Sequence, residues 1–227
     1  MARVVIFGIG DLASLAWYVL THDSPHEVAG FTVDAAYVAN PMLHDLPVVP
    51  FETVEARFPP PEARMIVPVG WRDINGLRAS RHRAAKAKGY AFVSYVSSRA
   101  SVWPDLIVGE NCMIFDGAIV QPFARIGDGV IIRSGGFLSH HVTIADNCFL
   151  APRVCLGGGV EVGERCFLGL NATVNPHVKV ARCCLIGAGA VVCADTAEDG
   201  IYFGVPARRQ PGSADRHTRS KPPRGAG

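Results

Sequence analysis

A large aliphatic residue occupies every sixth position between residues 96 and 192, in seventeen consecutive repeats. The series is Val96, Val102, Val108, Ile114, Val120, Ile126, Ile132, Leu138, Ile144, Leu150, Leu156, Val162, Leu168, Val174, Val180, Ile186 and Val192. A period of six fits neither an α-helix nor a half-buried strand, so it indicates a repeat architecture. Each hexad predicts a short strand and a turn, and three hexads predict one triangular coil of a parallel β-solenoid.

A second column, two residues before each aliphatic residue, contains mostly small side chains. Side chains at positions i and i−2 of a strand point the same way, so both columns should face the interior. Four of the seven cysteines stand in this column, namely Cys112, Cys148, Cys166 and Cys184. There they are expected to act as compact hydrophobic residues. The odd count and the lack of a C-x-x-C pair also disfavour disulfides and zinc, so no metal is expected.

The hexad period is absent from residues 1–94, where apolar runs alternate with helical patterns. Strands are expected at 4–7, 28–33, 46–49 and 65–69, and helices after Ala13 as far as Leu20 and at 73–88. Alternation of this kind predicts a small, Rossmann-like α/β unit with a parallel sheet, which would bind a nucleotide or sugar. The solenoid should then span 95–195, followed by an ordered segment at 196–209. Residues 210–227, with few large apolar side chains, are expected to be disordered.

The overall charge narrows the choice of partners and compartment. A net charge of +2 gives no general attraction to nucleic acid or to an anionic membrane surface. No apolar stretch has the length of a membrane span, and the N-terminal apolar run is too short for a signal peptide. We therefore expect a cytoplasmic protein that neither binds nucleic acid nor inserts into a membrane.

The turn after the first predicted strand contains the pattern G-x-G-x-x-A, formed by Gly8, Gly10 and Ala13. Asp34 follows twenty-one residues after Ala13, at the end of the second predicted strand. This arrangement is typical of a nucleotide-binding turn, in which helix-terminal amides bind phosphate and the acidic residue binds a ribose or a base. Asp11 lies in the same turn, where its charge opposes a diphosphate. The alternative is a tight strand-to-helix turn that binds no ligand.

A polar interruption of the repeats, Ser139-His140-His141, offers the best candidate for chemistry. A coil of eighteen residues places Gly158 beside His140, within the run Gly157–Gly159. We expect the glycine run to leave open space against which a ligand could lie. Imidazole exchanges protons near neutral pH, so a histidine at this place is a candidate general base. The alternative is that the two histidines are ordinary surface turn residues.

The chain resembles the hexapeptide-repeat sugar acetyltransferases, of the sialic acid O-acetyltransferase and nucleotide-amino-sugar N-acetyltransferase type. The likeness covers residues 3–209 and rests on the unbroken hexads, on 5–10 (VIFGIG), on His140, on 166–172 (CFLGLNA) and on 204–208 (GVPAR). It implies a left-handed β-helix and a homotrimer, with acetyl-CoA as co-substrate between neighbouring solenoids. It also implies acetyl transfer to an amino or hydroxyl group of a sugar or sugar nucleotide.

The resemblance further implies site residues in this chain. His140 matches the family's catalytic base, while His141 stands where members commonly have Glu or Asp, so His141 either orients His140 or is itself the base. The implied coenzyme contacts are Phe149, Gly158, Leu170 and Ala188. The implied acceptor contacts are Gly8, Gly10, Asp11 and Asp34.

Two other functional classes are compatible with a hexapeptide solenoid. A metal enzyme of the γ-carbonic-anhydrase kind needs three histidines, whereas only His141 and His177 share one face of the repeat. A non-catalytic binding module is the second alternative, because a fold alone does not imply turnover.

Overall fold

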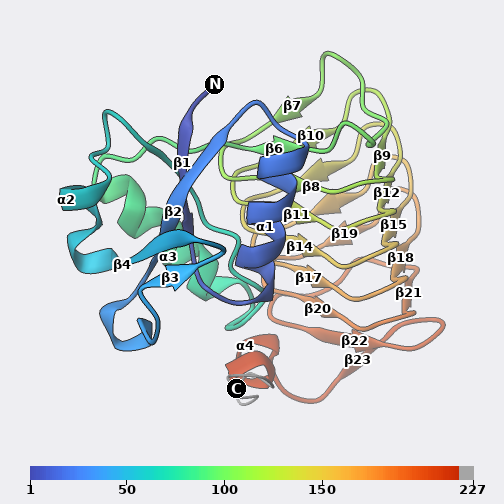
Figure 1. The fold of residues 1–227 in the computed structure, drawn as a ribbon. Helices are drawn as coiled ribbons and strands as arrows, with labels where there is room; N and C mark the ends of the chain where they lie inside the picture. Colours follow the sequence, from blue (N-terminus) through green and yellow to red (C-terminus); the bar gives the residue numbers. More distant parts are fainter. Residues whose placement is uncertain (220–227) are drawn as a thin grey trace.

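The structure, a computed structural model, describes residues 1–219 and consists of an N-terminal α/β unit beside a long solenoid (Figure 1). The strands of the N-terminal unit are β1 (Arg3–Phe7), β2 (Glu27–Val33), β3 (Met42–Leu43), β4 (Leu46–Pro50) and β5 (Arg64–Ile66). Its helices are α1 (Asp11–His22), α2 (Val54–Arg57) and α3 (Gly76–Ala87), with 3-10 turns at Ala35–Tyr37 and Phe51–Thr53. The strand order is β3-β4-β2-β1-β5, and only the β3–β4 pair is antiparallel.

Helices cover both faces of the N-terminal sheet. Helix α1 packs through Ala13, Ala16 and Leu20 against one face, whereas α2 and α3 cover the other. The helix expected at 73–88 begins instead at Gly76, because Asp73, Ile74 and Asn75 have left-handed backbone with φ of 58°, 39° and 63°. A right-handed helix cannot include three such residues.

Three sheets of short parallel strands form the solenoid, and we name them by their outer faces. The docking sheet holds β6 (Tyr95–Val96), β8 (Met113–Ile114), β11 (Ile131–Ile132), β14 (Phe149–Leu150), β17 (Phe167–Leu168), β20 (Leu185–Ile186), β22 (Ile201–Phe203) and the antiparallel β23 (Arg208–Gln210). The apolar sheet holds β9 (Ile119–Val120), β12 (Phe137–Leu138), β15 (Cys155–Leu156), β18 (Thr173–Val174) and β21 (Val191–Val192). The polar sheet holds β7 (Ile107–Val108), β10 (Arg125–Ile126), β13 (Thr143–Ile144), β16 (Glu161–Val162) and β19 (Lys179–Val180).

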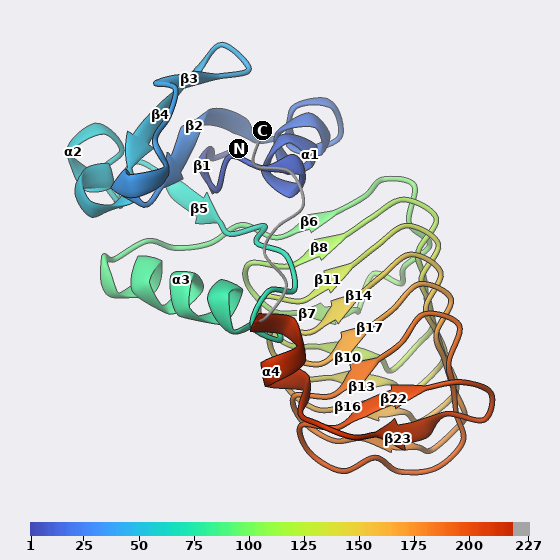
Figure 2. The ribbon, with the colours of Figure 1, turned by 90° about the horizontal axis from the view of Figure 1, so that it is seen from below.

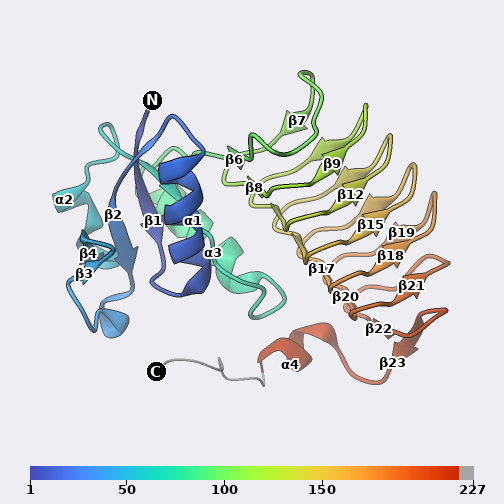
Figure 3. The same cartoon turned by 45° about the vertical axis from the view of Figure 1, so that its right-hand side comes forward.

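The pairing register confirms a coil of eighteen residues, as in Phe137 with Cys155 and Thr143 with Glu161. Figure 3 shows the successive coils stacked along one axis. Every residue of the aliphatic series from Ile114 to Val192 is at most 3 % exposed. The prediction of a parallel β-solenoid is therefore confirmed.

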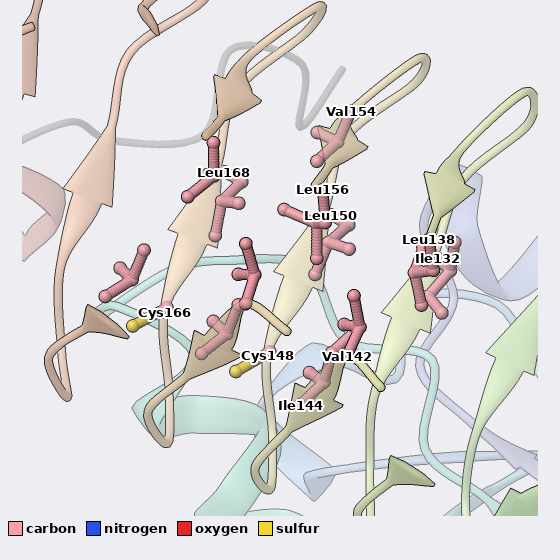
Figure 4. Close-up of a cluster of buried hydrophobic side chains, with 14 of the residues drawn as sticks. Ile132, Leu138, Val142, Ile144, Cys148, Leu150, Val154, Leu156, Cys166 and Leu168 are labelled. Atoms are coloured by element: carbon pink, nitrogen blue, oxygen red, sulfur yellow. The ribbon is translucent and has the colours of Figure 1, made fainter. Parts of the chain in front are cut away.

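The cysteines of the second column are buried in the solenoid core, among aliphatic residues (Figure 4). Cys148 and Cys166 each donate a thiol hydrogen bond to a backbone carbonyl, with Sγ–O distances of 3.0 Å to Gly163 and to Ala181. Burial raises the pKa of the Cys112 thiol to about 12. These thiols fill the interior, and all seven cysteines are free.

The N-terminal unit covers the docking sheet. Outward side chains of that sheet, such as Met113 and Ile131, share one hydrophobic cluster with Ile6 and with α1. Figures 2 and 3 show α1 between the N-terminal sheet and the solenoid. Where α1 ends, the Asp23 carboxylate accepts hydrogen bonds from the Tyr95 hydroxyl, the Ser97 hydroxyl and the Ser98 amide.

Helix α3 lies along the corner between the polar and docking sheets. Arg78, which is fully buried, donates to the carbonyl oxygens of Gly129, Asn147 and Cys148 at 2.9, 2.6 and 3.1 Å. Asn75, about one turn earlier, donates to two carbonyls of a further coil. The helical pitch of about 5.4 Å nearly matches the strand spacing of about 4.8 Å, so successive turns meet successive coils. No pattern in the sequence indicates this contact, which fixes the two units relative to each other.

The C-terminal segment corrects one expectation. Residues 210–227 were expected to be disordered, but α4 (Ala214–Arg219) is helical and packs against the end of the solenoid. Ala214 and Thr218 of this helix are buried. The helix packs with few apolar residues of its own because Ile74 and Leu185 supply the apolar surface. Residues 220–227 lie outside the described part of the chain. Within residues 1–219, no helix has the length and apolar character needed to cross a membrane.

Candidate active site

The two histidines lie in the turn between β12 and β13, at the corner of the apolar and polar sheets. Stacking aligns His140 with Gly158, and His141 with Phe123, Gly159 and His177. Gly159 N–H donates to the His140 carbonyl at 2.9 Å, which joins the two coils. The Gln121 side-chain oxygen accepts from the His140 amide at 3.1 Å. The backbone of this turn is therefore held by neighbours above and below it.

The two imidazoles contact each other directly. His140 Nδ1 lies 3.1 Å from His141 Nδ1, which is a hydrogen-bonding distance. His141 has a left-handed backbone, with φ of 59°, and its ring lies 4.7 Å from that of Phe123. Both histidines are exposed, so the pair is open to a ligand. With Nδ1 engaged, His140 presents Nε2 as its free ring nitrogen.

The glycine run does not leave the open space that the sequence suggested. A Cβ atom at Gly158 would lie 2.6 Å from His140 Cε1 and 2.9 Å from its Nε2, so the imidazole already fills that space. His177 covers the next glycine, since a Cβ at Gly159 would lie 2.6 Å from its Nδ1. The rings of His140 and His177, in the neighbouring coils, lean over the glycines. The spacing of residues along the chain does not reveal the orientation of these rings. Gly158 instead provides a close approach between its backbone and the candidate base.

One amide of the run is free to bind a ligand. Gly157 N–H donates to Val174, and Gly159 N–H to His140, whereas Gly158 N–H has no partner within residues 1–219. The backbone of Gly158 lies beside the ring of His140, since a Cβ at this position would be 2.6 Å from Cε1. An unpaired backbone N–H beside a candidate base is the donor that a developing oxyanion requires.

The other expected coenzyme contacts fall into two groups. Leu170 and Ala188 are exposed, in turns that join the docking sheet to the apolar sheet. They therefore lie at the opposite edge of the apolar sheet from His140. Phe149 is only 6 % exposed, on the docking sheet beneath the N-terminal unit, and its ring stacks on Phe167. The N-terminal unit thus covers the face on which Phe149 lies, and a coenzyme contact at Phe149 stays a prediction.

A separate cavity of about 690 Å³ opens in the N-terminal unit at the carboxyl ends of β1 and β2. Gly8 and Asp34 are among its lining residues, together with Arg72, Arg81 and Tyr37. Asp34 forms an ion pair with Arg81, with 2.5 Å between Oδ2 and Nη2. Arg81 could not be predicted from the sequence, because only the fold brings α3 beside the end of β2.

The two remaining expected acceptor residues lie beside the cavity. Gly10 caps the start of α1 and Asp11 is its first residue, and both are exposed. Neither belongs to the cavity lining, whereas Gly8 does. The structure thus brings together two of the four expected acceptor residues.

The metal-enzyme alternative finds no support in the geometry. No cluster of three or more His, Cys, Asp or Glu side chains within residues 1–219 is arranged to hold a metal ion. His177 and His141 lie two coils apart, and the coil of Gly159 separates them.

Comparison with known proteins identifies the family. Residues 105–140 match the bacterial transferase hexapeptide (six repeats) model. No curated protein sequence matches the chain. Among solved structures, PerB from Caulobacter crescentus in complex with CoA and GDP-perosamine is 30 % identical, with a TM-score of 0.81. The similarity covers 92 % of this chain and 98 % of PerB. The chain belongs to the hexapeptide-repeat sugar acetyltransferase family. As a member, it is an acetyltransferase that uses acetyl-CoA as its donor.

Two further structures agree with this assignment. A histidine-to-asparagine mutant of perosamine N-acetyltransferase from Caulobacter crescentus, in complex with CoA and GDP-perosamine, is 29 % identical, with a TM-score of 0.84. The similarity covers 93 % of this chain and 98 % of the mutant's chain. The acetyltransferase domain of PglB from Neisseria gonorrhoeae FA1090, in complex with acetyl coenzyme A, is 20 % identical and shows the shared fold alone. Its TM-score is 0.80, over 92 % of this chain and 98 % of that domain.

Proposed function

We propose that this acetyltransferase transfers an acetyl group from acetyl-CoA to an amino or hydroxyl group of a nucleotide-linked sugar, with His140 as general base. The observation that carries the proposal is the His140 imidazole, which is hydrogen-bonded through Nδ1 to His141 and lies against the backbone of Gly158, a residue whose N–H has no partner within residues 1–219. One residue thus has a fixed ring orientation, an exposed nitrogen and an adjacent oxyanion donor. The two similar structures from Caulobacter crescentus were solved with CoA and GDP-perosamine.

The histidine pair gives His141 the role of a positioning residue. When His140 Nδ1–H donates to His141 Nδ1, the Nε2 of His140 carries a lone pair and can accept a proton. The opposite tautomer places a hydrogen on Nε2 and is unproductive. His141 therefore performs, as a neutral hydrogen-bond acceptor, the orienting role that a carboxylate has in other family members.

The reaction then follows as a direct transfer. The acceptor nitrogen or oxygen attacks the thioester carbonyl while His140 Nε2 removes its proton. The Gly158 N–H stabilises the oxyanion of the tetrahedral intermediate. When this intermediate collapses, the carbon–sulfur bond breaks, and the CoA thiolate takes the proton back from the His140 imidazolium.

A homotrimer of left-handed solenoids would complete the donor site. The outer face of the apolar sheet carries Ile119, Phe137, Cys155 and Val191, and Ile119 is 42 % exposed. An exposed apolar face of this kind is typical of a subunit interface. Because Leu170 and Ala188 lie at the opposite edge from His140, a rotational contact brings these two edges together from neighbouring subunits. Acetyl-CoA would bind between them, with Gly158 beside its thioester.

The N-terminal unit would hold the acceptor. Its parallel strands have the order β4-β2-β1-β5, which is half of a Rossmann-like sheet, and ligands of such sheets bind at the carboxyl ends of the strands. The cavity beside Gly8 and Asp34 lies at that edge, and its volume suits a nucleotide. The start of α1, at Gly10 and Asp11, adds helix-terminal amides.

Free cysteines fit a reducing compartment such as the cytoplasm.

The test uses His140→Ala and His140→Asn in the full chain, assayed with acetyl-CoA and a panel of nucleotide-linked amino sugars by mass spectrometry. We expect turnover to fall by about 100-fold or more in both variants, as for loss of a general base. CoA affinity and oligomeric state should be unchanged. Near wild-type turnover in either variant would exclude His140 as the base. A wild-type chain that binds CoA but acetylates none of the panel would contradict the proposed acceptor class.

A further inference from the structure

The C-terminal helix α4 reaches the acceptor cavity from outside the region that resembles the family. It follows β23 and packs through Ala214 beside Ile74 and Leu185. Asp199 accepts the Asp215 N–H at 3.0 Å, which fixes the start of the helix. Figure 2 shows α4 beside the start of α3, the helix that lines the cavity. A segment distant in sequence therefore lies next to the proposed acceptor site.

The segment between α4 and the cavity, residues 73–75, has an unusual backbone conformation, and we call it the wall of the cavity. Asp73, Ile74 and Asn75 are consecutive left-handed residues, a conformation that costs about 1 kcal/mol or more for each non-glycine residue. The Thr218 hydroxyl of α4 accepts the Ile74 N–H at 2.7 Å, in a buried position. Arg165 donates to the carbonyls of Asp73 and Ile74 from the solenoid side. Helix α4 and the solenoid thus hold this wall in a shape that the backbone does not favour.

The last residue of α4, Arg219, extends along this wall into the cavity lining. Its Nε donates to Asp73 at 2.5 Å and to Asp215 at 3.1 Å. Its two Nη groups have no hydrogen-bond partner within residues 1–219, so four N–H donors of the guanidinium are available. The contacts of Nε therefore fix the position of the side chain, while the N–H groups of both Nη atoms remain available to a ligand.

The cavity contains three arginines and two aspartates, Asp34 and Asp73. Arg81 pairs with Asp34, and Arg219 pairs with Asp73. Arg72 forms no ion pair within the described chain, so the lining carries one positive charge in excess. Arg72, Asp73 and Arg219 lie beyond the end of β5, away from Asp34 on the β2 side. In a sheet of this kind the ribose lies at the acidic residue after β2, and the diphosphate lies at the turn after β1, which is nearer to β5.

We infer that Arg219 is an acceptor-binding residue, and that α4 supplies it to the diphosphate of the nucleotide-linked sugar. The inference rests on the proposed function of the cavity. A planar guanidinium suits bidentate binding of phosphate oxygens, and its Nε contacts with Asp73 and Asp215 leave that fork preorganised. The competing explanation is that Arg219 forms only a surface ion pair, which contributes little.

The experiment measures binding of GDP and UDP to the full chain by calorimetry, with guanosine and uridine as probes that lack the phosphates. Arg219→Ala should weaken binding of the preferred diphosphate about ten-fold or more, as expected for lost charged hydrogen bonds. Nucleoside and CoA affinities should stay within two-fold. Arg216→Ala is the matched control, because Arg216 is exposed on the same helix and lies outside the cavity lining. Arg219→Lys should recover part of the loss, since a lysine retains the charge without the fork.

These outcomes distinguish a failure of the role of Arg219 from a failure of the proposed function. Equal diphosphate affinity in Arg219→Ala and Arg216→Ala, with normal binding by wild type, overturns the role of Arg219 and leaves the proposed function intact. Parallel losses of nucleoside and diphosphate affinity in Arg219→Ala also overturn it, because they indicate a damaged cavity. Wild-type protein that binds neither diphosphate contradicts the proposed acceptor site itself, and Arg219 with it.

Discussion

Gly158→Ala tests the closest contact in the candidate active site. The added Cβ would lie 2.6 Å from His140 Cε1, 2.9 Å from Nε2 and 3.3 Å from Nδ1. Non-bonded carbon atoms prefer about 3.5–4.0 Å, so the imidazole must move by roughly 1 Å. Gly158 does not have a positive φ, so alanine strains no backbone dihedral and the ring alone must give way.

The magnitude follows from two effects. A shift of roughly 1 Å breaks the 3.1 Å bond between the two imidazoles, and misplacement on that scale costs about 100-fold in rate. Overpacking at the same contact costs about 1–3 kcal/mol of stability. For a chain of this size, that lowers Tm by roughly 2–12 °C.

The assay combines release of free CoA thiol from acetyl-CoA in the presence of acceptor with thermal unfolding, for four proteins. These are wild type, Gly158→Ala, His140→Ala and the double variant. In the His140→Ala background the ring is absent and the added methyl group meets open space, so alanine at 158 should cause no further loss of Tm or activity. Gly158→Ala with turnover within three-fold of wild type would refute the reasoning, as would the same Tm loss in both backgrounds.

Three other predictions concern the scaffold. Arg78→Ala leaves buried carbonyls unpaired and should cost about 3–5 kcal/mol in chemical denaturation, whereas the exposed Arg83→Ala on the same helix should cost under 0.5 kcal/mol; equal effects would contradict a role for Arg78 in joining the units. Hydrogen bonds from Ser98 and Tyr95 hold the pKa of Asp23 well below its ordinary value of 3.8, so its stabilisation is complete above that value and is lost as pH falls below it. Asp23→Asn should therefore lower the free energy of unfolding at pH 7 and approach wild type only below about pH 4; a difference that is constant across this range would argue against the carboxylate. Phe137→Glu, on the outer face of the apolar sheet, should shift the mass measured by light scattering from that of the proposed trimer to that of a monomer, whereas Thr143→Glu on the polar sheet should leave it unchanged; a trimer that persists in Phe137→Glu would place the interface elsewhere.

The repeat region shows what local sequence can predict. Each hexad meets the residues eighteen positions away, so the interior columns and the cysteine environment follow from the period alone. The same rule placed Gly158 beside His140 correctly. It failed on the space between them, because the direction in which an imidazole leans depends on side-chain torsions and not on register.

The outer faces of the repeat were less predictable for a similar reason. Phe149 and Phe137 have equivalent positions in their hexads, yet Phe149 is buried beneath the N-terminal unit whereas Phe137 is only partly covered. What covers an outward side chain is determined by elements that do not repeat. The α4 helix is another such case, since its short, polar sequence is ordered only by contacts with Ile74 and the solenoid end.

The sequence by itself determined the six-residue ladder, the solenoid and the place of His140, because all three depend on contacts at a fixed spacing along the chain. Only the tertiary structure decided that His140 is bonded to His141 and lies against Gly158, that Arg81 neutralises Asp34, and that Arg219 reaches the cavity. The histidine contacts depend on side-chain torsions, which the repeat does not determine. The contacts of Arg81 and Arg219 join residues whose separation follows no period, and they depend on how the N-terminal unit, the solenoid and α4 pack together.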